Sequence, residues 1–172
     1  SALTELYKEI TNCRRCELAR QRTKAVPGEG SENASIVFID EAPGWHEDQQ
    51  GRPFVGPAGQ FLDELLGSIG LKRQQVYICN VLKCRPPGNR DPLPTEIETC
   101  RQWLDSQLQL LHPKMIVTLG RHSMARFFPG ETISKIHGKA RKEGNIIYFA
   151  MYHPAAALHQ QKLRETIKAD ML

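Results

Sequence analysis

The sequence predicts an α/β protein in which helices cover both faces of a central, four-stranded and mainly parallel sheet. Four short apolar runs rich in β-branched residues carry this prediction, and helical patterns lie between them. The runs are continuously apolar rather than alternating, as expected of strands that are covered on both faces. Strand and helix alternate at spacings suited to crossover connections, so we expect a three-layer α/β/α sandwich. The four expected strands are residues 35–39, 76–81, 115–119 and 146–151.

The helical segments show apolar residues at helical spacing and recognisable ends. Residues 57–69 place five apolar side chains on one stripe, and Gly70 follows as a stop signal. Within residues 94–111, Thr95 and Glu98 have the spacing of a capping box at the helix start. Further helices are expected at residues 3–11, 122–128 and 154–172, the last with Pro154 near its first turn.

Length and composition are those of one globular domain. The chain has 172 residues, of which 40% are hydrophobic and 24% charged, so we expect residues 1–172 to form a single domain. No apolar run reaches the roughly 18 residues that a membrane span requires. The first ten residues lack the apolar core of a secretion signal, and the cytoplasm is the expected compartment.

The charge distribution suggests an anionic partner. The formal net charge is +4 and the isoelectric point is about 8.9, which alone is a weak indication. Basic residues gather in 14–22, 83–90 and 135–142, all expected to be loops or helix ends. A basic rim on one face suits DNA phosphates. Solvated loops explain the same pattern equally well.

Four of the five cysteines have the spacing of a metal site. Cys13 and Cys16 are separated by two residues, and Cys84 and Cys100 by fifteen. Four thiolates can hold tetrahedral zinc or a [4Fe-4S] cluster, and the spacing does not choose between them. A redox motif at Cys13 needs a preceding strand, which is not expected here. Buried thiols without a metal are the remaining alternative, and they are the better interpretation for Cys79, which lies inside an expected strand.

Informative residues follow each expected strand, at the edge where parallel sheets bind their ligands. Asp40 follows the first strand and Asn80 ends the second. Gly120 follows the third strand and His153 the fourth. Each of them alone is as well explained by a turn or by the start of a helix. Together they predict one crevice at the carboxyl ends of the strands.

Three segments resemble the family 4 uracil-DNA glycosylases, the iron–sulfur members of the uracil-DNA glycosylase superfamily found in bacteria and archaea. They are E-A-P-G-x-x-E-D-x-x-G-R-P-F-V-G-x-A-G at 41–59, N-V-x-K-C-R-P-P-G-N-R at 80–90 and H-P-A at 153–155. The resemblance covers nearly the whole chain. It implies an enzyme that flips uracil out of DNA, hydrolyses its N-glycosidic bond and leaves an abasic site for base excision repair. It also implies that a structural [4Fe-4S] cluster, rather than zinc, is held by Cys13, Cys16, Cys84 and Cys100.

The resemblance assigns roles within the crevice. Phe54 is the expected plate on which the flipped base stacks, with core packing as the alternative. The Asn80 amide can donate to uracil O4 and accept from N3–H, whereas cytosine presents the opposite pattern. His153 is placed at uracil O2, where it would stabilise negative charge on the departing base, unless it merely starts a helix. Glu41 and Glu47 are the carboxylates expected to orient the attacking water or to stabilise the sugar cation.

Two positions near the start of the first motif bear on water activation. Some superfamily members have a water-orienting aspartate at the position of Ala42, and this chain does not. Family members usually have glycine at the position of Asp40. An aspartate there slows catalysis if it points inward, because it adds bulk and negative charge beside a leaving anion; it would otherwise orient water or point away. The expected uracil-binding residues are Asp40, Glu41, Ala42, Phe54, Asn80 and His153.

DNA contacts are expected from the loops after the second and fourth strands. Arg85, Asn89 and Arg90 are candidates for the DNA backbone and Leu158 for an apolar wedge, although a leucine in a helix core fits equally well. The partner would be uracil-containing DNA, single- or double-stranded, bound by a monomer with a steep salt dependence. One rival is a relative that traps uracil-DNA covalently through a histidine in an inserted basic loop, which residues 80–95 lack. The other is a DNA-binding or redox iron–sulfur module with a degenerate pocket.

Overall fold

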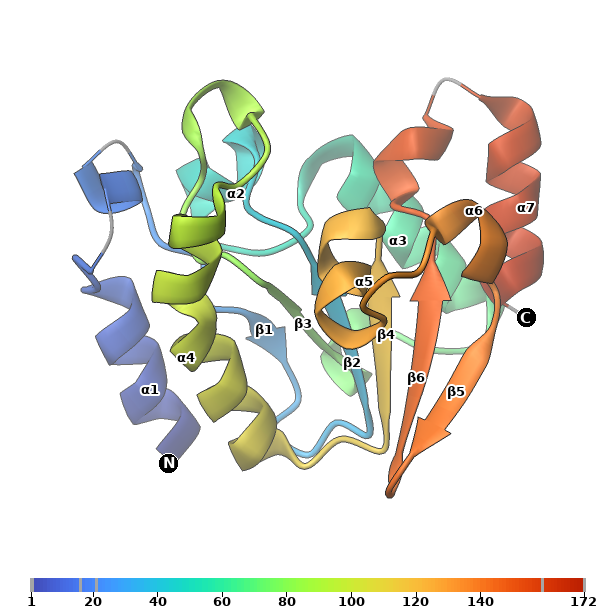
Figure 1. Ribbon diagram of the computed structural model, residues 1–172, viewed down its shortest axis with the longest axis horizontal. Coiled ribbons are helices and arrows are strands. Elements are labelled where there is room, and N and C mark those ends of the chain that lie inside the picture. Colours follow the sequence, from blue (N-terminus) through green and yellow to red (C-terminus); the bar gives the residue numbers. More distant parts are fainter. Residues whose placement is uncertain (1, 16, 21, 159, 172) are drawn as a thin grey trace.

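Figure 1 shows the computed structural model, which describes residues 2–15, 17–20, 22–158 and 160–171. These residues form a central six-stranded sheet with the order β1-β3-β2-β4-β6-β5. Helices on both faces make the predicted three-layer α/β/α sandwich (Figure 1). The four predicted strands are confirmed, and they are parallel: β2 (Ile36–Asp40), β3 (Tyr77–Asn80), β4 (Met115–Leu119) and β6 (Ile146–Met151).

The predicted number of four strands was wrong, because two short strands extend the sheet at its edges. β1 (Glu29–Gly30) pairs antiparallel with β3, and β5 (Ala140–Glu143) pairs antiparallel with β6. β1 is two residues long, and all four residues of β5 are exposed, so neither produces an apolar run. The charged side chains of β5 are typical of an edge strand that avoids pairing with other chains.

The helices form one layer on each face of the sheet. α3 and α7 pack on one face, against Phe38 of β2, whereas α1 and α4 pack on the other, against Val37 and Ile39. This division follows from the two-residue period of a strand. None of the helices in the described ranges has the length and apolar character required to cross a bilayer. The α-helices are α1 (Ala2–Thr11), α2 (Trp45–Gln50), α3 (Gly56–Ser68), α4 (Pro94–Leu111), α5 (Arg121–Phe127), α6 (Ile133–Ile136) and α7 (Gln161–Met171), and the 3₁₀ helices are η1 (Glu17–Arg20), η2 (Arg73–Gln75), η3 (Pro87–Asn89) and η4 (Pro154–Ala157).

The ends of two helices differ from the sequence predictions. α4 starts at Pro94 as predicted, but the residue before it is Leu93, whose N–H donates to the Glu96 carboxylate at 2.8 Å. The first turn is therefore closed by Glu96, and the predicted pair of Thr95 and Glu98 was wrong. The helix predicted at 154–172 is divided into η4 and α7.

The cause of this division lies at His153. The Ala156 N–H donates to the His153 carbonyl at 3.0 Å, which is the tighter 3₁₀ spacing, and the Ala155 N–H donates to the His153 ring. The chain after β6 therefore forms the 3₁₀ helix η4 directly after His153, and the α-helix α7 begins only at Gln161.

The carboxyl ends of the four parallel strands lie at one edge of the sheet, which is the upper end in Figure 1. Asp40 and Asn80 are directly paired in register there. The Gly120 N–H donates to the Met151 carbonyl at 2.9 Å, so the segments after β4 and β6 also meet. The fold thereby gathers the residues predicted to form the crevice.

Candidate active site

Phe54 lies in a strained turn between α2 and α3. Its φ of +50° is left-handed, a conformation that costs a non-glycine residue on the order of 1–3 kcal/mol. Arg73 stabilises the turn by donating to the Phe54 carbonyl at 2.6 Å and to the Pro53 carbonyl at 2.5 Å. The side chain of Phe54 is buried in the same apolar cluster as Phe61. The turn therefore places an aromatic residue in a backbone conformation that residues other than glycine rarely adopt.

Glu47 stabilises the same turn from the α2 side. One carboxylate oxygen accepts the Gly44 N–H at 3.0 Å, and the other accepts the Val55 N–H at 3.0 Å. The carboxylate thus ties the start of α2 to the residue before α3, with Phe54 between them. The contacts of Glu47 are those of a bracing group, and its catalytic role stays a prediction.

The His153 ring lies against Phe54. The ring centroids are 5.5 Å apart and the planes are inclined by 25°, which is a stacked contact. The Ala155 N–H donates to Nδ1 at 2.9 Å, so the proton of the neutral ring lies on Nε2. Gly120 permits this arrangement, because its φ is +88° and a Cβ added there would lie 3.2 Å from the His153 Cβ. The ring is therefore held from three sides.

Asp40 pairs with His153 at the carboxyl ends of the parallel strands. Its Oδ1 lies 2.9 Å from Nε2, and the residue is 7% exposed. The contact becomes an ion pair when the ring is protonated, although the Nε2–H group is not well aligned on Oδ1. Burial lowers the pKa of His153, but the Asp40 carboxylate, with smaller effects of Glu41 and Glu47, outweighs burial and raises the pKa above its ordinary value.

Asn80 is buried with an unpaired amide nitrogen. The residue is 1% exposed, and Nδ2 has no hydrogen-bond partner in the described part of the chain. Its backbone is held by Lys83, whose Nζ donates to the Asn80 carbonyl at 2.9 Å and to the Gln107 side chain at 2.6 Å. The register places its side chain next to that of Asp40. An unsatisfied buried donor costs about 1–3 kcal/mol, and this one lies at the edge where parallel sheets bind their ligands, so it is suited to a ligand that accepts a hydrogen bond.

Glu41 and Ala42 follow Asp40 and are half-buried. The carbonyls of Asp40 and Glu41 accept backbone N–H groups of residues 81 and 82 at 2.8 and 2.9 Å, so the pairing continues beyond the strand ends. Ala42 packs against an apolar cluster that contains cysteines. The segment that follows β2 therefore adjoins the cysteine-containing cluster.

Three of the four predicted metal ligands lie in this apolar cluster. Cys84 and Cys100 are buried in it and Cys13 packs against it, whereas Cys16 lies outside the described residues. No group of three or more side chains in the described ranges is arranged to hold a metal ion. Cys79 belongs to a different apolar cluster and is fully buried, which confirms the prediction of a buried thiol in a strand.

The sulfur of each of the three described candidate ligands, Cys13, Cys84 and Cys100, accepts an N–H group. The Arg22 guanidinium donates to Cys84 Sγ at 2.9 Å, and the Trp103 indole donates to Cys13 Sγ at 3.4 Å. Cys100 Sγ accepts a backbone N–H at 3.3 Å. Such donors stabilise thiolates, and N–H groups directed at ligand sulfurs are a common feature of iron–sulfur sites. The donor set therefore fits a cluster bound through thiolates.

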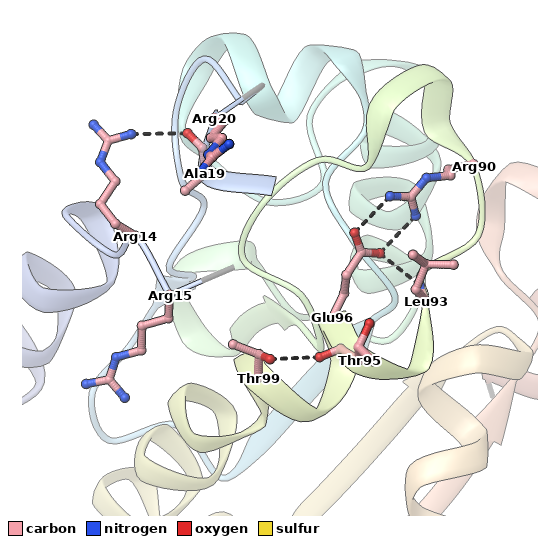
Figure 2. Close-up of a pocket in the computed structure, with 9 residues that line it drawn as sticks. All are labelled: Arg14, Arg15, Ala19, Arg20, Arg90, Leu93, Thr95, Glu96 and Thr99. Atoms are coloured by element: carbon pink, nitrogen blue, oxygen red, sulfur yellow. Dashed lines mark hydrogen bonds and ion pairs between the residues drawn. The ribbon is translucent and has the colours of Figure 1, made fainter. Parts of the chain in front are cut away.

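The predicted DNA-contact residues differ in their surroundings. The Arg90 guanidinium makes two 2.8 Å hydrogen bonds to the Glu96 carboxylate, which compensates its charge (Figure 2). Arg85 and Leu158 are half-buried, and the side chain of Asn89 lies outside what the structure describes. Contacts of these residues with DNA stay predictions.

Arg73 is a residue of the site that sequence reasoning missed. It lies in η2, outside the three motifs, yet it holds Phe54. Its guanidinium also pairs with Glu29 at 3.2 Å and with Asp63 at 3.3 Å. No local sequence signal identifies such a role, because it arises only from tertiary contacts.

Comparison with known proteins points to one family. The family model of the uracil DNA glycosylase superfamily matches residues 27–172. The chain is 49% identical to the type-4 uracil-DNA glycosylase of Sulfurisphaera tokodaii, over 98% of this chain and 81% of the relative. It is 47% identical to the type-4 uracil-DNA glycosylase of Archaeoglobus fulgidus, over 98% of this chain and 89% of the relative. A type-5 uracil-DNA glycosylase of Pyrobaculum aerophilum is 27% identical, over 88% of this chain and 81% of the relative.

We expect Gly59→Ala to destabilise the protein, although alanine is ordinarily favoured in helices. A Cβ at Gly59 would lie 2.0 Å from the Phe54 carbonyl oxygen, so the strained turn has to shift, at a cost of about 1–3 kcal/mol. Gly67→Ala in the same helix is the control, since nothing lies within 4 Å of its Cβ position, and it should stabilise by about 0.5–1 kcal/mol. Urea unfolding measures both effects. Equal free energies of unfolding for the two variants would contradict a tightly fixed turn.

Asp40→Asn should lower the pKa of His153, because burial persists when the carboxylate is removed. An NMR titration of the imidazole in both proteins measures the change. Since the pKa of folded His153 is raised, the pair stabilises the fold fully below the unfolded pKa of about 6.5 and ceases to do so as pH rises through the folded pKa. The stability difference between the two proteins should therefore close toward alkaline pH. An unchanged His153 titration would show that the two side chains do not interact in solution.

Proposed function

This chain belongs to the uracil-DNA glycosylase superfamily, and we propose that it is an enzyme that hydrolyses the N-glycosidic bond between uracil and deoxyribose in DNA. The product is an abasic site, which is the starting point of base excision repair. Residues 1–172 would act as one domain and as a monomer, on single- or double-stranded DNA. The observation that carries the proposal is the buried Asn80 amide with its unpaired Nδ2. Asn80 is paired in register with Asp40, which contacts the His153 ring that stacks on Phe54.

Asn80 would discriminate uracil from cytosine. Nδ2 would donate to uracil O4, while the side-chain oxygen accepts from N3–H. Cytosine has an amino group and an unprotonated nitrogen at these places, so both contacts are lost and buried groups remain unpaired. Sites built in this way reject the wrong ligand on the order of 10⁴-fold. The Lys83 hydrogen bond to the Asn80 carbonyl supports this role, because it fixes the backbone that carries the amide.

The flipped base would displace His153 from Phe54. The two rings are in direct contact, so a base that stacks on Phe54 has to separate them. That movement also separates Nε2 from Asp40 and makes the Nε2–H group available to uracil O2. Donation to O2 then stabilises the negative charge that develops on the departing base. The separation adds to the few kcal/mol that unstacking a base already costs.

Glu41 is the carboxylate that we assign to the sugar side of the reaction. It lies half-buried at the strand ends, and its backbone is held by the pairing that continues beyond β2. A carboxylate there would stabilise the oxocarbenium-like sugar and orient the attacking water, as in other glycosidic cleavages. Glu47 would contribute by holding the Phe54 turn, because both of its oxygens accept backbone N–H groups.

We propose that Cys13, Cys16, Cys84 and Cys100 hold a [4Fe-4S] cluster. The N–H donors at the three described sulfurs and their common apolar surroundings support this assignment. The cluster would supply a cross-link between the segment after α1 and the first part of α4. Its ligands lie outside the crevice, so its role in this chain is structural.

Two alternatives predict different products. Covalent trapping needs a nucleophilic histidine after β3, and residues 81–93 contain no histidine. A binding module without turnover is favoured by one observation, the pairing of Asp40 with the histidine that would assist the leaving group. Uracil release distinguishes these alternatives.

An oligonucleotide with a single uracil, treated with the protein and then with alkali, tests the proposed function. Strand scission at the uracil position is expected, because alkali cleaves abasic sites. An otherwise identical oligonucleotide with cytosine should stay intact. A denaturant-resistant protein–DNA adduct would indicate trapping instead, and an intact uracil strand would indicate a binding module.

Asp40→Gly should accelerate uracil release at least several-fold in single-turnover measurements. The substitution removes a negative charge beside the leaving anion and frees His153 from its ion pair. Asp40→Asn removes the charge but keeps the bulk, so it separates the two contributions. Equal rates for the wild type and Asp40→Gly would contradict this role of Asp40. A slower Asp40→Gly would assign Asp40 to the orientation of water.

Cys84→Ala should lose bound iron and lower the melting temperature, since it removes one end of the proposed cross-link. Cys79→Ala is the matched control, because Cys79 is equally inaccessible but lies in a different apolar cluster. It should retain iron. Iron content and thermal unfolding of the two variants provide the readout. Iron retained by Cys84→Ala would refute the ligand assignment, and iron lost without a change in stability would refute the structural role.

A further inference from the structure

A buried series of hydrogen bonds connects α4 with the backbone of Asn80. Lys83 Nζ donates to the Asn80 carbonyl at 2.9 Å and to Gln107 Oε1 at 2.6 Å. Gln107 Nε2 in turn donates to the Tyr77 hydroxyl at 3.1 Å. Tyr77 and Asn80 are the first and last residues of β3, so the series leaves this strand at one end and returns to it at the other. Lys83 and Gln107 are both fully buried.

Gln107 is held in one orientation within this series. Its Nε2 also donates to the Pro27 carbonyl at 2.6 Å, so both N–H groups of the amide have acceptors. A reversed amide would place its oxygen against the Pro27 carbonyl oxygen, so these contacts direct Oε1 toward Lys83. The Tyr77 hydroxyl is itself hydrogen-bonded to Tyr7 of α1. Gln107 therefore offers Lys83 an acceptor at a fixed position.

Lys83 links this acceptor to Asn80. Its N–H donates to Cys100 Sγ at 3.3 Å and its carbonyl accepts the Val26 N–H at 2.7 Å, so the backbone of Lys83 is fixed on both sides. The side chain is a flexible four-carbon stem, and the position of Nζ is therefore determined by its acceptors. Gln107 Oε1 is the nearer of its two acceptors in the described ranges, and the Asn80 carbonyl is the other. Without the Gln107 oxygen, the buried amine would lose the contact that positions it against Asn80.

The backbone of Asn80 depends on this contact because the neighbouring edge strand is short. β1 pairs with Tyr77 and Ile78 and does not reach Asn80. On the other side, Asn80 is paired in register with Asp40 of β2. A side-chain amide that has to serve two groups of one base needs a well-fixed backbone, since hydrogen bonds weaken steeply when they are misaligned. Lys83 supplies a hydrogen bond to Asn80 beyond the end of the β1 pairing.

We propose that Gln107 is a positioning residue for uracil: through Lys83 it fixes the backbone of Asn80 and thereby determines how tightly the Asn80 amide binds the base. The inference rests on the proposed function, because it takes Asn80 as the residue that reads uracil. It assigns part of the base recognition to a residue of α4 that lies outside the three sequence motifs. Because Gln107 acts only through Asn80, its contribution belongs to the base and not to the DNA backbone.

Binding of free uracil, measured by calorimetric titration, tests the inference. A DNA duplex with a tetrahydrofuran abasic analogue, which has no base, is measured alongside it. Gln107→Met removes the acceptor at nearly constant size, and it should weaken uracil binding about 10-fold, the equivalent of one hydrogen bond. The Kd for the abasic duplex should stay unchanged, because Asn80 has no base to read there. Gln107→Asn keeps the amide but shortens its reach, so it should weaken uracil binding in the same way.

Gln107→Glu is the conservative variant that should rescue uracil binding. A carboxylate oxygen can still accept from Lys83, so the Kd for uracil should be retained. The variant loses the donors to Pro27 and Tyr77, so its melting temperature should fall. Retained uracil binding in a less stable protein separates the positioning role from a contribution to stability.

Two further variants serve as controls. Gln109→Met is the matched substitution, because Gln109 is an exposed glutamine of the same helix. Phe128→Leu controls for lost stability, because Phe128 is buried in a different apolar cluster, with Met124 and Ala150. Both controls should keep the Kd for uracil of the wild type.

An unchanged Kd for uracil in Gln107→Met, at equal iron content, would overturn the inference. An equal loss of uracil binding in Gln107→Met and Gln107→Glu, or in Gln107→Met and Phe128→Leu, would overturn it as well. Uracil release from DNA by the wild type is measured separately. If the wild type binds and releases uracil and Gln107→Met binds it equally well, the positioning role alone fails. A wild type that neither binds free uracil nor releases it from DNA contradicts the proposed function.

Discussion

The parallel pairing of β2 with β3 and β4 is the constraint on which the site depends. Because these strands run in one direction, Asp40 and Asn80 end side by side, and the pairing of β4 with β6 brings His153 to the same edge. Parallel neighbours also require long connections from one end of the sheet to the other, which here are helices. The Phe54 turn lies directly before one of these helices, α3. The sheet therefore determines both the crevice and its surroundings.

The polar groups at the carboxyl ends of the strands are buried, and they differ in how many hydrogen-bond partners they have. Lys83 is 1% exposed, and burial lowers its pKa, but its Nζ has two acceptors. The Asn80 amide nitrogen has none among the described residues. Phe54 has a left-handed backbone, in a turn that Arg73 and Glu47 stabilise by hydrogen bonds. An unpaired donor and a strained turn each cost on the order of 1–3 kcal/mol. Well-held groups and an unsatisfied one thus occur together at the carboxyl ends of the strands, where parallel sheets bind their ligands.

Sequence reasoning succeeded where burial leaves a local pattern and failed where contacts are tertiary. Continuous apolar runs revealed the four parallel strands, whereas β1 and β5 are short or exposed and leave no such pattern. The convergence of Asn80 and His153 followed from topology alone. The bracing of Phe54 by Arg73 did not, because η2 and the turn are linked only in space. The orientation of Asp40 was left open by the sequence, since a strand-end side chain has several directions available.

In the proposed mechanism, Asp40 would compete with uracil for the same donor. Its carboxylate lies 2.9 Å from Nε2 of His153, the atom that would serve uracil O2. Before the bond is cleaved, uracil O2 would be a neutral carbonyl and therefore a weaker acceptor than the Asp40 carboxylate. The competition would therefore disfavour the bound substrate most, and it would weaken as negative charge develops on O2. The negative charge of Asp40 acts in the opposite sense, because it repels the forming uracil anion. Repulsion between two charges at a buried site would be poorly screened and would grow through the transition state, so we expect it to outweigh the competition for the Nε2–H group. Glycine at this position would remove both the competition for Nε2–H and the repulsion of the uracil anion. Burial would then favour the neutral form of the His153 ring, which can still donate through Nε2.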